Sequence, residues 1–159
     1  MKNYKNEEIV FNGCPGCAYA NHEFTLPCGM AYENERFTLS QDWEFPIEGF
    51  FIVSIKRHIE RIVDLTVEER NEMFDIIVKT LNILRNNNIC DEFEVIFYEK
   101  DDTHLHAWIM PRHKWMRDLV GNVTGNIGTI LKYAKDNFSN EEVYKRIDDI
   151  NKIVKNNFN

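Results

Sequence analysis

The order of apolar segments predicts an α+β fold in which an antiparallel β-sheet packs against one long helix. Two segments, 50–55 and 93–98, are rich in Phe, Val and Ile and are bounded by turn residues, as strands are. Between them, Thr66 and Glu69 have the spacing of a capping box that starts a helix. Strand pairs around one helix, followed by further helical pattern, favour an antiparallel layer.

The first half of the chain contains two strands and the long helix. The first thirty residues are expected to be irregular, because Gly and Pro interrupt every period there. A strand is expected at 35–39, before the strand at 50–55. The helix that follows Thr66 is expected to end at three consecutive asparagines and to bury one face. That face consists of Val67, Phe74, Ile77, Val78, Leu81 and Leu84.

The second half of the chain returns to the sheet and then becomes helical. The polar stretch 99–102 is expected to turn the chain into a strand at 104–110, which Pro111 closes. Ser139 and Glu142 then form a second possible capping box. One face of this last helix consists of Val143, Ile147, Ile150 and Val154.

Composition narrows the classes of function. The chain has 159 residues, close to the size of one domain, and 43% of them are hydrophobic, enough for a core. Nineteen basic and 26 acidic residues give a net charge of −7, which makes binding to a nucleic-acid polymer or an anionic membrane unfavourable. The longest apolar run, Phe50–Val53, is too short to span a membrane, and the N-terminus lacks the pattern of a secretory signal. We therefore expect a cytoplasmic protein without a membrane partner.

The segment Cys14-Pro-Gly-Cys17 carries two thiols at a spacing that suits several chemistries. The pair can bind one metal ion, act as a redox couple, or simply be buried. The motif alone does not choose among these interpretations. An irregular surrounding segment and the lack of alternating βαβ order both weigh against the redox interpretation.

The segment His104-Leu-His106-Ala-Trp108 is the second candidate site. Side chains at alternate positions of a strand share a face, so His104, His106 and Trp108 are expected to lie together while Leu105 and Ala107 enter the core. Two titratable groups on one face, with basic residues after them, indicate a functional site. The other histidines, at 22, 58 and 113, have no such pattern of their own.

Further motifs accompany these two in a fixed order along the chain. They are Tyr32-Glu33-Asn34, Asp42, Gly49 before a strand, Lys56-Arg57-His58, Asp64-Leu65-Thr66 and His104–Arg112. The ordered set resembles the histidine triad (HIT) superfamily over roughly residues 14–112. The family pattern alternates three histidines with apolar residues, so His104 and His106 take the first two positions and Trp108 the third.

The resemblance implies an activity, a substrate class and an assembly. It makes 1–112 a HIT-like nucleotide-binding domain and 113–159 a C-terminal helical extension of the same domain. His106 would be the nucleophile that attacks the α-phosphorus of a nucleotide, dinucleoside polyphosphate or nucleoside phosphoramidate, giving a nucleotidyl-histidine. Asp42 occupies the position of the acid that binds ribose hydroxyls. Members of the family usually form homodimers.

Zinc-bearing members of the superfamily bind the metal through equivalents of four residues present here. Carried over by position, these are Cys14, Cys17, His58 and His104. The resemblance therefore implies a structural zinc ion in a closed Cys₂His₂ site. It places the chain beside the zinc-bearing branch, with Trp at the third triad position.

Departures from the family pattern define the alternatives. Trp108 replaces the third histidine and cannot shuttle a proton, Phe50 replaces a frequent histidine, and Asp101 and Asp102 precede His104. We therefore expect a HIT-family nucleotide hydrolase or nucleotidyltransferase, with a non-catalytic zinc-stabilised nucleotide- or partner-binding protein as the alternative. A thiol–disulfide protein using Cys14 and Cys17 is a third hypothesis.

Overall fold

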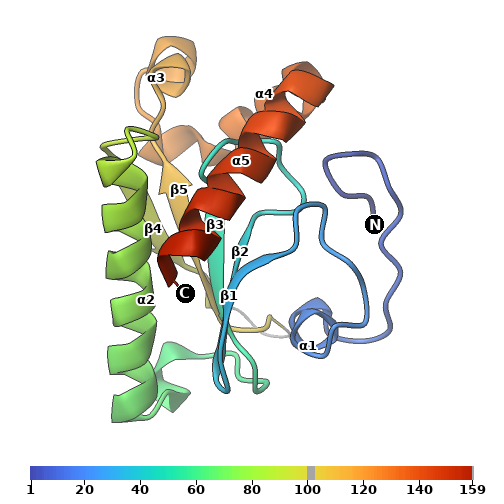
Figure 1. Cartoon of the computed structure of the whole chain (residues 1–159), viewed down its shortest axis with the longest axis vertical. Helices are drawn as coiled ribbons and strands as arrows, with labels where there is room; N and C mark the ends of the chain where they lie inside the picture. Colours follow the sequence, from blue (N-terminus) through green and yellow to red (C-terminus); the bar gives the residue numbers. More distant parts are fainter. Residues whose placement is uncertain (100–102, 159) are drawn as a thin grey trace.

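The centre of the molecule is an antiparallel β-sheet. The computed structural model describes residues 1–99 and 103–158, and in these the sheet has five strands in the order β1-β2-β3-β5-β4 (Figure 1). All neighbouring strands pair antiparallel, as the sequence predicted. The strands are β1 (Met30–Glu33), β2 (Phe37–Gln41), β3 (Phe51–Ile55), β4 (Phe93–Phe97) and β5 (His106–Pro111).

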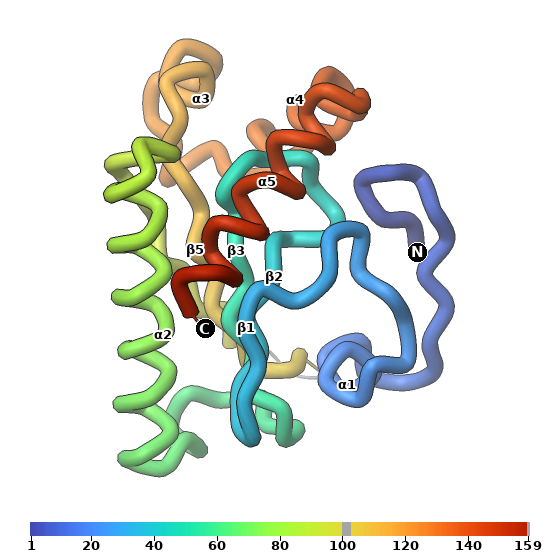
Figure 2. Tube along the Cα trace, in the orientation of Figure 1, coloured from blue at the N-terminus to red at the C-terminus, as the bar shows by residue number. Residues whose placement is uncertain are grey.

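Helices cover the sheet unevenly. The long helix α2 and the C-terminal helix α5 lie side by side over one face, whereas the short helix α1 lies on the opposite side (Figures 1 and 2). The helices are α1 (Pro15–Ala20), α2 (Val67–Asn86), α3 (Lys114–Val120), α4 (Ile127–Asn137) and α5 (Glu141–Phe158), with 3₁₀ turns at Ile62–Asp64 and Thr124–Asn126. The expectation of an irregular N-terminal segment is wrong at α1, because Pro15 at the first helical position starts a short helix there.

The alternation of β5 separates a core face from a second face. Leu105, Ala107 and Ile109 have no exposed surface and pack with α2 and α5, whereas His106 and Trp108 are half-buried on the opposite face. This confirms the predicted division of side chains, although the strand begins at His106 and not at 104. The two histidine positions therefore differ in backbone context.

Helix α2 begins as predicted but buries a different face. The Thr66 Oγ1 accepts the Glu69 amide at 3.2 Å, and the Glu69 carboxylate accepts the Thr66 amide at 2.8 Å, which completes the capping box. Val67, Phe74 and Val78 are 55%, 53% and 50% exposed, so the predicted face is partly wrong. The buried stripe is centred on Met73, Ile76, Ile77, Thr80, Ile83 and Leu84. The predicted apolar face and the buried stripe of α2 overlap and have the same helical periodicity, and only the buried stripe packs against the sheet.

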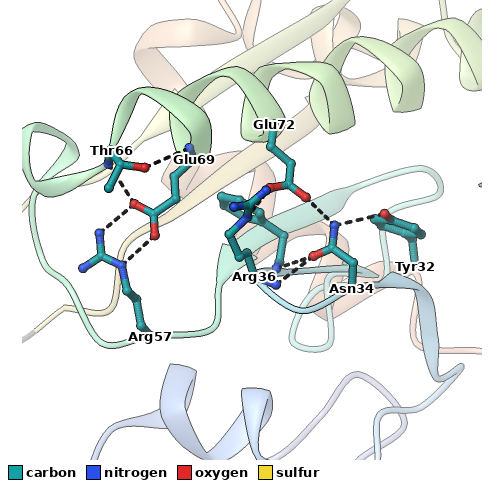
Figure 3. Close-up of polar contacts among 8 residues, drawn as sticks. Tyr32, Asn34, Arg36, Arg57, Thr66, Glu69 and Glu72 are labelled. Atoms are coloured by element: carbon teal, nitrogen blue, oxygen red, sulfur yellow. Dashed lines mark hydrogen bonds and ion pairs between the residues drawn. The ribbon is translucent and has the colours of Figure 1, made fainter.

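Polar contacts connect α2 to the strand ends near the metal-ligand candidates. The Arg57 guanidinium donates to both Glu69 oxygens at 2.7 Å, and the Asn34 amide donates to Glu72 at 2.6 Å (Figure 3). The Arg57 pair holds the pKa of Glu69 at about 2, well below its ordinary value. These contacts hold the end of β3, and with it His58, against the start of α2.

The C-terminal helices complete the core. The face made of Val143, Ile147, Ile150 and Val154 is buried, as predicted. The predicted capping box at Ser139 is wrong: the Asn140 side chain accepts the Val143 amide at 3.1 Å, and Ser139 instead donates to the Lys135 carbonyl. Asparagine caps a helix as well as serine does, so the true start lies one residue later. None of the described helices has the length and hydropathy needed to cross a bilayer.

Candidate functional site

Four side chains from three separate segments converge beside the sheet. Cys14 and Cys17 come from the start of α1, His58 follows β3, and His104 precedes β5; one ligand atom of each lies within 4.8 Å of all the others. The sulfur–nitrogen distances are 3.5 Å for Cys14–His104, 3.4 Å for Cys17–His58 and 3.6 Å for Cys17–His104. A tetrahedral zinc ion with bonds of ~2.0–2.3 Å separates its ligands by roughly 3.3–3.8 Å. The three sulfur–nitrogen distances therefore fit such an ion.

The hydrogen bonding of His104 leaves the correct ring nitrogen for a metal. Its Nε2–H donates to the Ile55 carbonyl at 2.5 Å, so the Nδ1 lone pair faces the two cysteine sulfurs. A backbone carbonyl on the second ring nitrogen is the usual support of a metal-ligating histidine. Burial lowers the pKa of His104, which favours the neutral ring that a metal requires. The four side chains form a closed Cys₂His₂ site that suits a structural zinc ion.

The two sulfurs owe their common direction to α1. Cys14 is the N-cap of α1 and Cys17 lies in its first turn, so both side chains point toward His104. Burial and the neighbouring Cys14 raise the pKa of the Cys17 thiol. A pair of thiolates this close is stable only beside a cation, which is what a metal ion supplies.

Gly16 is a site residue that the sequence analysis did not single out. A Cβ built on Gly16 would lie 2.3 Å from Cγ of His104 and 2.5 Å from its Cβ. Any larger residue would push the helix and the imidazole apart. The sequence shows a glycine inside the Cys-x-x-Cys segment. Its requirement for a missing side chain comes from the His104 ring, which is about ninety residues away in the sequence.

His106 lies next to the metal cluster and has the opposite tautomer. Its Nδ1–H donates to the carbonyl of His104 at 2.8 Å, and Nε2, with its lone pair, has no hydrogen-bond partner among the residues that the structure describes. Burial lowers the pKa of His106, so the neutral ring dominates near pH 7. A neutral, oriented imidazole is a nucleophile that needs no separate base.

A cavity between α1 and the second face of the sheet gives access to His106. His104 and His106 line one side of this cavity, and Thr103 lies beside them. The remaining lining residues are Pro15, Gly16, Tyr19, Ser40, Trp43, Ile52 and Ser54. The cavity is mostly apolar apart from the imidazoles and several hydroxyl groups.

Trp108 takes a packing position beside the nucleophile candidate. Its ring lies 6.3 Å from that of His106 and meets Phe50 and Tyr98 edge to face at 5.2 and 4.9 Å. The two departures at 108 and 50 are therefore coupled, because each ring fills space against the other. Indole offers one N–H donor and no exchangeable acid at physiological pH.

Asp42 does not line the cavity. It is 3% exposed, and its Oδ1 accepts the amides of Glu44 and Phe45 at 2.8 and 2.7 Å. Burial raises the pKa of this carboxyl to about 7, against the effect of the two amide hydrogen bonds. Its predicted contact with ribose stays a prediction.

The basic residues that follow β5 are engaged with carboxylates. Arg112 lies 3.5 Å from Glu94, Arg117 lies 2.8 Å from Glu92, and Lys114 pairs with Asp118 at 2.5 Å. The expected turn at 99–102 and the acidic pair Asp101 and Asp102 fall largely outside the described residues, which omit 100–102. The remaining histidines bind elsewhere: His22 contacts Glu33, and the His113 Nε2–H donates to the Glu48 carbonyl.

Solved structures of similar fold bear the same family description. A Zn-bound histidine triad family protein from Mycobacterium smegmatis matches with a TM-score of 0.59 and 18% identity, over 87% of this chain and 92% of that one. A hypothetical histidine triad nucleotide-binding protein from Sulfolobus tokodaii strain7 matches with a TM-score of 0.60 and 18% identity, over 91% and 93%. A HIT family member from Bacillus subtilis gives 0.57 and 19%, over 76% and 96%.

These likenesses define the class of fold. No family model matches the sequence, and neither does any curated protein. At the identities found, structural likeness establishes architecture and leaves the activity to be argued from the site. The chain has the HIT fold, and its Cys₂His₂ cluster lies next to His106, which lines a cavity.

Proposed function

We propose that this chain is a HIT-type nucleotide hydrolase or nucleotidyltransferase that uses His106 as its nucleophile. The observation that carries the proposal is the 2.8 Å hydrogen bond from His106 Nδ1–H to the His104 carbonyl, which presents Nε2 as a free lone pair beside the cavity. The nucleotide-binding description of the similar Sulfolobus protein supports the substrate class. A nucleotide, dinucleoside polyphosphate or nucleoside phosphoramidate provides the α-phosphorus.

The chemistry would proceed in two displacements. In the first, Nε2 forms a bond to the α-phosphorus while the bond to the leaving group breaks, and the electron pair departs with that group. In the second, the oxygen of water or of another acceptor attacks the phosphorus, its proton goes to solvent, and the nitrogen recovers its lone pair. Water gives hydrolysis and another acceptor gives transfer. In these two steps, His106 Nε2 is the protein atom that forms and then breaks a bond to phosphorus.

A zinc ion held by Cys14, Cys17, His58 and His104 would act structurally. All four ligand positions come from the protein, so no open coordination position remains for water or substrate. The zinc-bound state of the similar mycobacterial protein supports this assignment. Such an ion would join α1 to the segment that follows β3 and to the segment that precedes β5, and His104 carries the carbonyl that orients His106.

One observation favours the alternative of a non-catalytic, zinc-stabilised nucleotide- or partner-binding protein. Trp108 stands where a third histidine would assist the leaving group, and it is held between Phe50 and Tyr98. A fixed indole supports binding better than proton transfer. Formation of a covalent intermediate separates the two functions.

We also propose that two copies assemble through α2 and the edge strand β4. Phe74 and Val78 are 53% and 50% exposed on α2, and Val95 is 39% exposed on β4. Phe74 contacts Phe97 of β4, so these side chains form one apolar surface. An open strand edge beside such a surface favours pairing with an identical edge.

Within each chain, we propose that residues 1–112 form the nucleotide-binding domain and that residues 113–159 form a C-terminal helical extension of it.

Trapping the intermediate tests the proposed activity. We expect a nucleotide labelled at the α-phosphorus to leave an acid-labile phosphoramidate on the wild-type chain, located at His106 by peptide mass. His106→Ala should remove the label and lower turnover by at least ~10³-fold, as loss of a nucleophile does. His22→Ala is the matched control, because His22 is an exposed histidine outside the cavity. Tight nucleotide binding without any label would establish the binding function in place of the enzyme.

A further inference from the structure

The two cysteines of the metal cluster share one helical turn. Cys14 is the N-cap of α1, Cys17 is the third residue of that helix, and their sulfurs lie within 4.8 Å of each other. Helix geometry places the Cα atoms of such a pair about 5 Å apart, inside the range of roughly 4.4–6.8 Å that disulfides require. The pair can therefore form a disulfide with little movement of the backbone. The irregular segment that weighed against a redox role is absent at this point of the chain.

One side of the cluster is open to solvent. Cys14 and Cys17 are both partly exposed, and the His58 side chain is 44% exposed, whereas His104 is buried. A small oxidant can reach the sulfurs from this side. A thiolate is the form of cysteine that binds a metal, and it is also the form that reacts with peroxides.

The chain's two other cysteines lie outside the cluster. Burial raises the pKa of the Cys28 thiol to about 11, which keeps that thiol protonated and unreactive near pH 7. The Cys90 thiol donates to the Glu92 carbonyl at 3.2 Å. Any disulfide is therefore expected between Cys14 and Cys17.

The two halves of α1 are held in different ways. The helix lies apart from the other four helices (Figure 1), and its second half is anchored by the buried side chains of Ala18 and Tyr19. Its first half faces His104 through Gly16, which also lines the cavity. A metal ion would join this first half to His104, whose carbonyl accepts the hydrogen bond that orients His106.

We propose that Cys14 and Cys17 form a redox switch, in which a hydroperoxide converts the two metal-binding thiolates into a disulfide. In the first step, one thiolate sulfur bonds to a peroxide oxygen, the O–O bond breaks, and the departing oxygen takes a proton from solvent. In the second, the other thiolate displaces hydroxide from the sulfenic sulfur, and that hydroxide takes a proton as well. Each sulfur loses one electron, and the peroxide gains two.

The disulfide would release the zinc ion. A disulfide sulfur is no longer a thiolate, so only the imidazoles of His58 and His104 remain of the four ligands. The first half of α1 then loses its connection to His104 beside the cavity. A dithiol reverses the change by exchange, since it is oxidised while both cysteines are reduced. The inference goes beyond the nucleotide chemistry and rests on the zinc assignment alone.

Peroxide treatment of the full, zinc-loaded chain tests the switch. We expect hydrogen peroxide to release about one zinc ion per chain to a chromogenic reporter, with the loss of about two thiols. Peptide mass mapping should find Cys14 linked to Cys17. Dithiothreitol with added zinc should restore the thiols and the bound metal. The double variant Cys28→Ser and Cys90→Ser is the matched control and should behave like the wild type.

Hydrogen exchange measures the effect on α1. The amides of Ala18 and Asn21 donate to the carbonyls of Cys14 and Cys17 at 3.0 and 2.9 Å. Both amides should exchange at least about tenfold faster after oxidation, because the metal no longer opposes local opening of the helix. Amides of α2 are the internal control and should exchange at an unchanged rate.

The outcomes separate the switch from the proposed function. Zinc retained under peroxide that oxidises Cys90 would overturn the switch, and so would oxidation of Cys14 and Cys17 to separate sulfinic acids. Nucleotide labelling of His106 in the zinc-loaded chain, together with either result, would leave the proposed enzyme standing. A folded chain that binds no zinc would overturn the metal assignment and the switch together.

Discussion

The metal cluster and the adjoining cavity use two histidines that lie two residues apart in opposite ways. His104 donates Nε2–H to the Ile55 carbonyl and turns Nδ1 toward the cysteines, whereas His106 donates Nδ1–H to the His104 carbonyl and leaves Nε2 open. The same residue type is therefore oriented as a metal-ligand candidate in one region and as the nucleophile candidate in the other. What separates them is the backbone carbonyl that each ring meets, because that carbonyl selects the tautomer.

Metal removal should have the largest effect, and it should act on the first region. We expect about one zinc ion per chain by elemental analysis of protein purified without added metal. Cys17→Ala should lose the ion and several kcal/mol of stability, since the free energy of metal binding is also free energy of folding. Melting temperatures with and without a chelator measure the loss.

A matched cysteine makes the zinc prediction specific. Cys90 donates to the Glu92 carbonyl, away from the cluster, so Cys90→Ala should retain the metal. A chain that is folded, equally stable and free of metal would contradict the assignment.

Substitution of Trp108 should change the second region without touching the first. The indole has no proton to give, so substrates with acidic leaving groups such as polyphosphate should react well, and phosphoramidates with amine leaving groups should lag. Trp108→His should narrow this difference, because general-acid assistance is worth ~10²–10⁴-fold. Rates on both substrate classes, with zinc content as a check, measure it. Equal rates in the wild type would mean that another group protonates the leaving group.

Gly16→Ala should show how closely the two regions are joined. An added methyl would overlap the His104 ring, so the helix or the imidazole must shift. We expect zinc affinity to fall by roughly 10–100-fold, as when a metal ligand loses its orientation, measured by competition with a chromogenic chelator. Gly128→Ala is the control: its Cβ meets no neighbour within 4 Å, and alanine in helix α4 should add slightly to stability. An unchanged affinity in Gly16→Ala would contradict the close approach.

The smallest effect concerns the ion pair beside His58. Arg57 holds the pKa of Glu69 at about 2, below its ordinary value of 4.5, so the stabilisation is complete above about pH 5 and is lost as the pH falls toward 2. Glu69→Gln keeps the cap but removes the charge, and should cost about 1–2 kcal/mol at pH 7. Urea unfolding of both proteins at pH 7, 4 and 3 should show the difference shrinking. Glu142→Gln, in an exposed pair, should cost much less.

Local pattern predicted those elements whose signal lies within a few residues. The capping box at Thr66 and the alternation around His106 are short-range features, and both are present in the fold. The wrong expectations arose where a pattern allowed two solutions. Val67, Phe74 and Val78 fit the periodicity of α2 as well as the buried stripe does, and only contact with the sheet decides between them. Likewise, Ser139 and Asn140 are both competent caps, and Asn140 takes the role.

The sequence by itself determined the antiparallel α+β class. It also determined that thiols and imidazoles are the candidate metal ligands, and its resemblance to the HIT superfamily grouped four residues that are far apart in the chain. Tertiary structure decided that Cys14, Cys17, His58 and His104 lie within 4.8 Å of one another, and which nitrogen each buried imidazole presents. It also placed Asp42 outside the cavity lining and brought Tyr19 and Ser40 into that lining. The physical reason is range: propensity and alternation act between neighbours in the chain, whereas coordination, tautomer and cavity shape depend on atoms that only folding brings together.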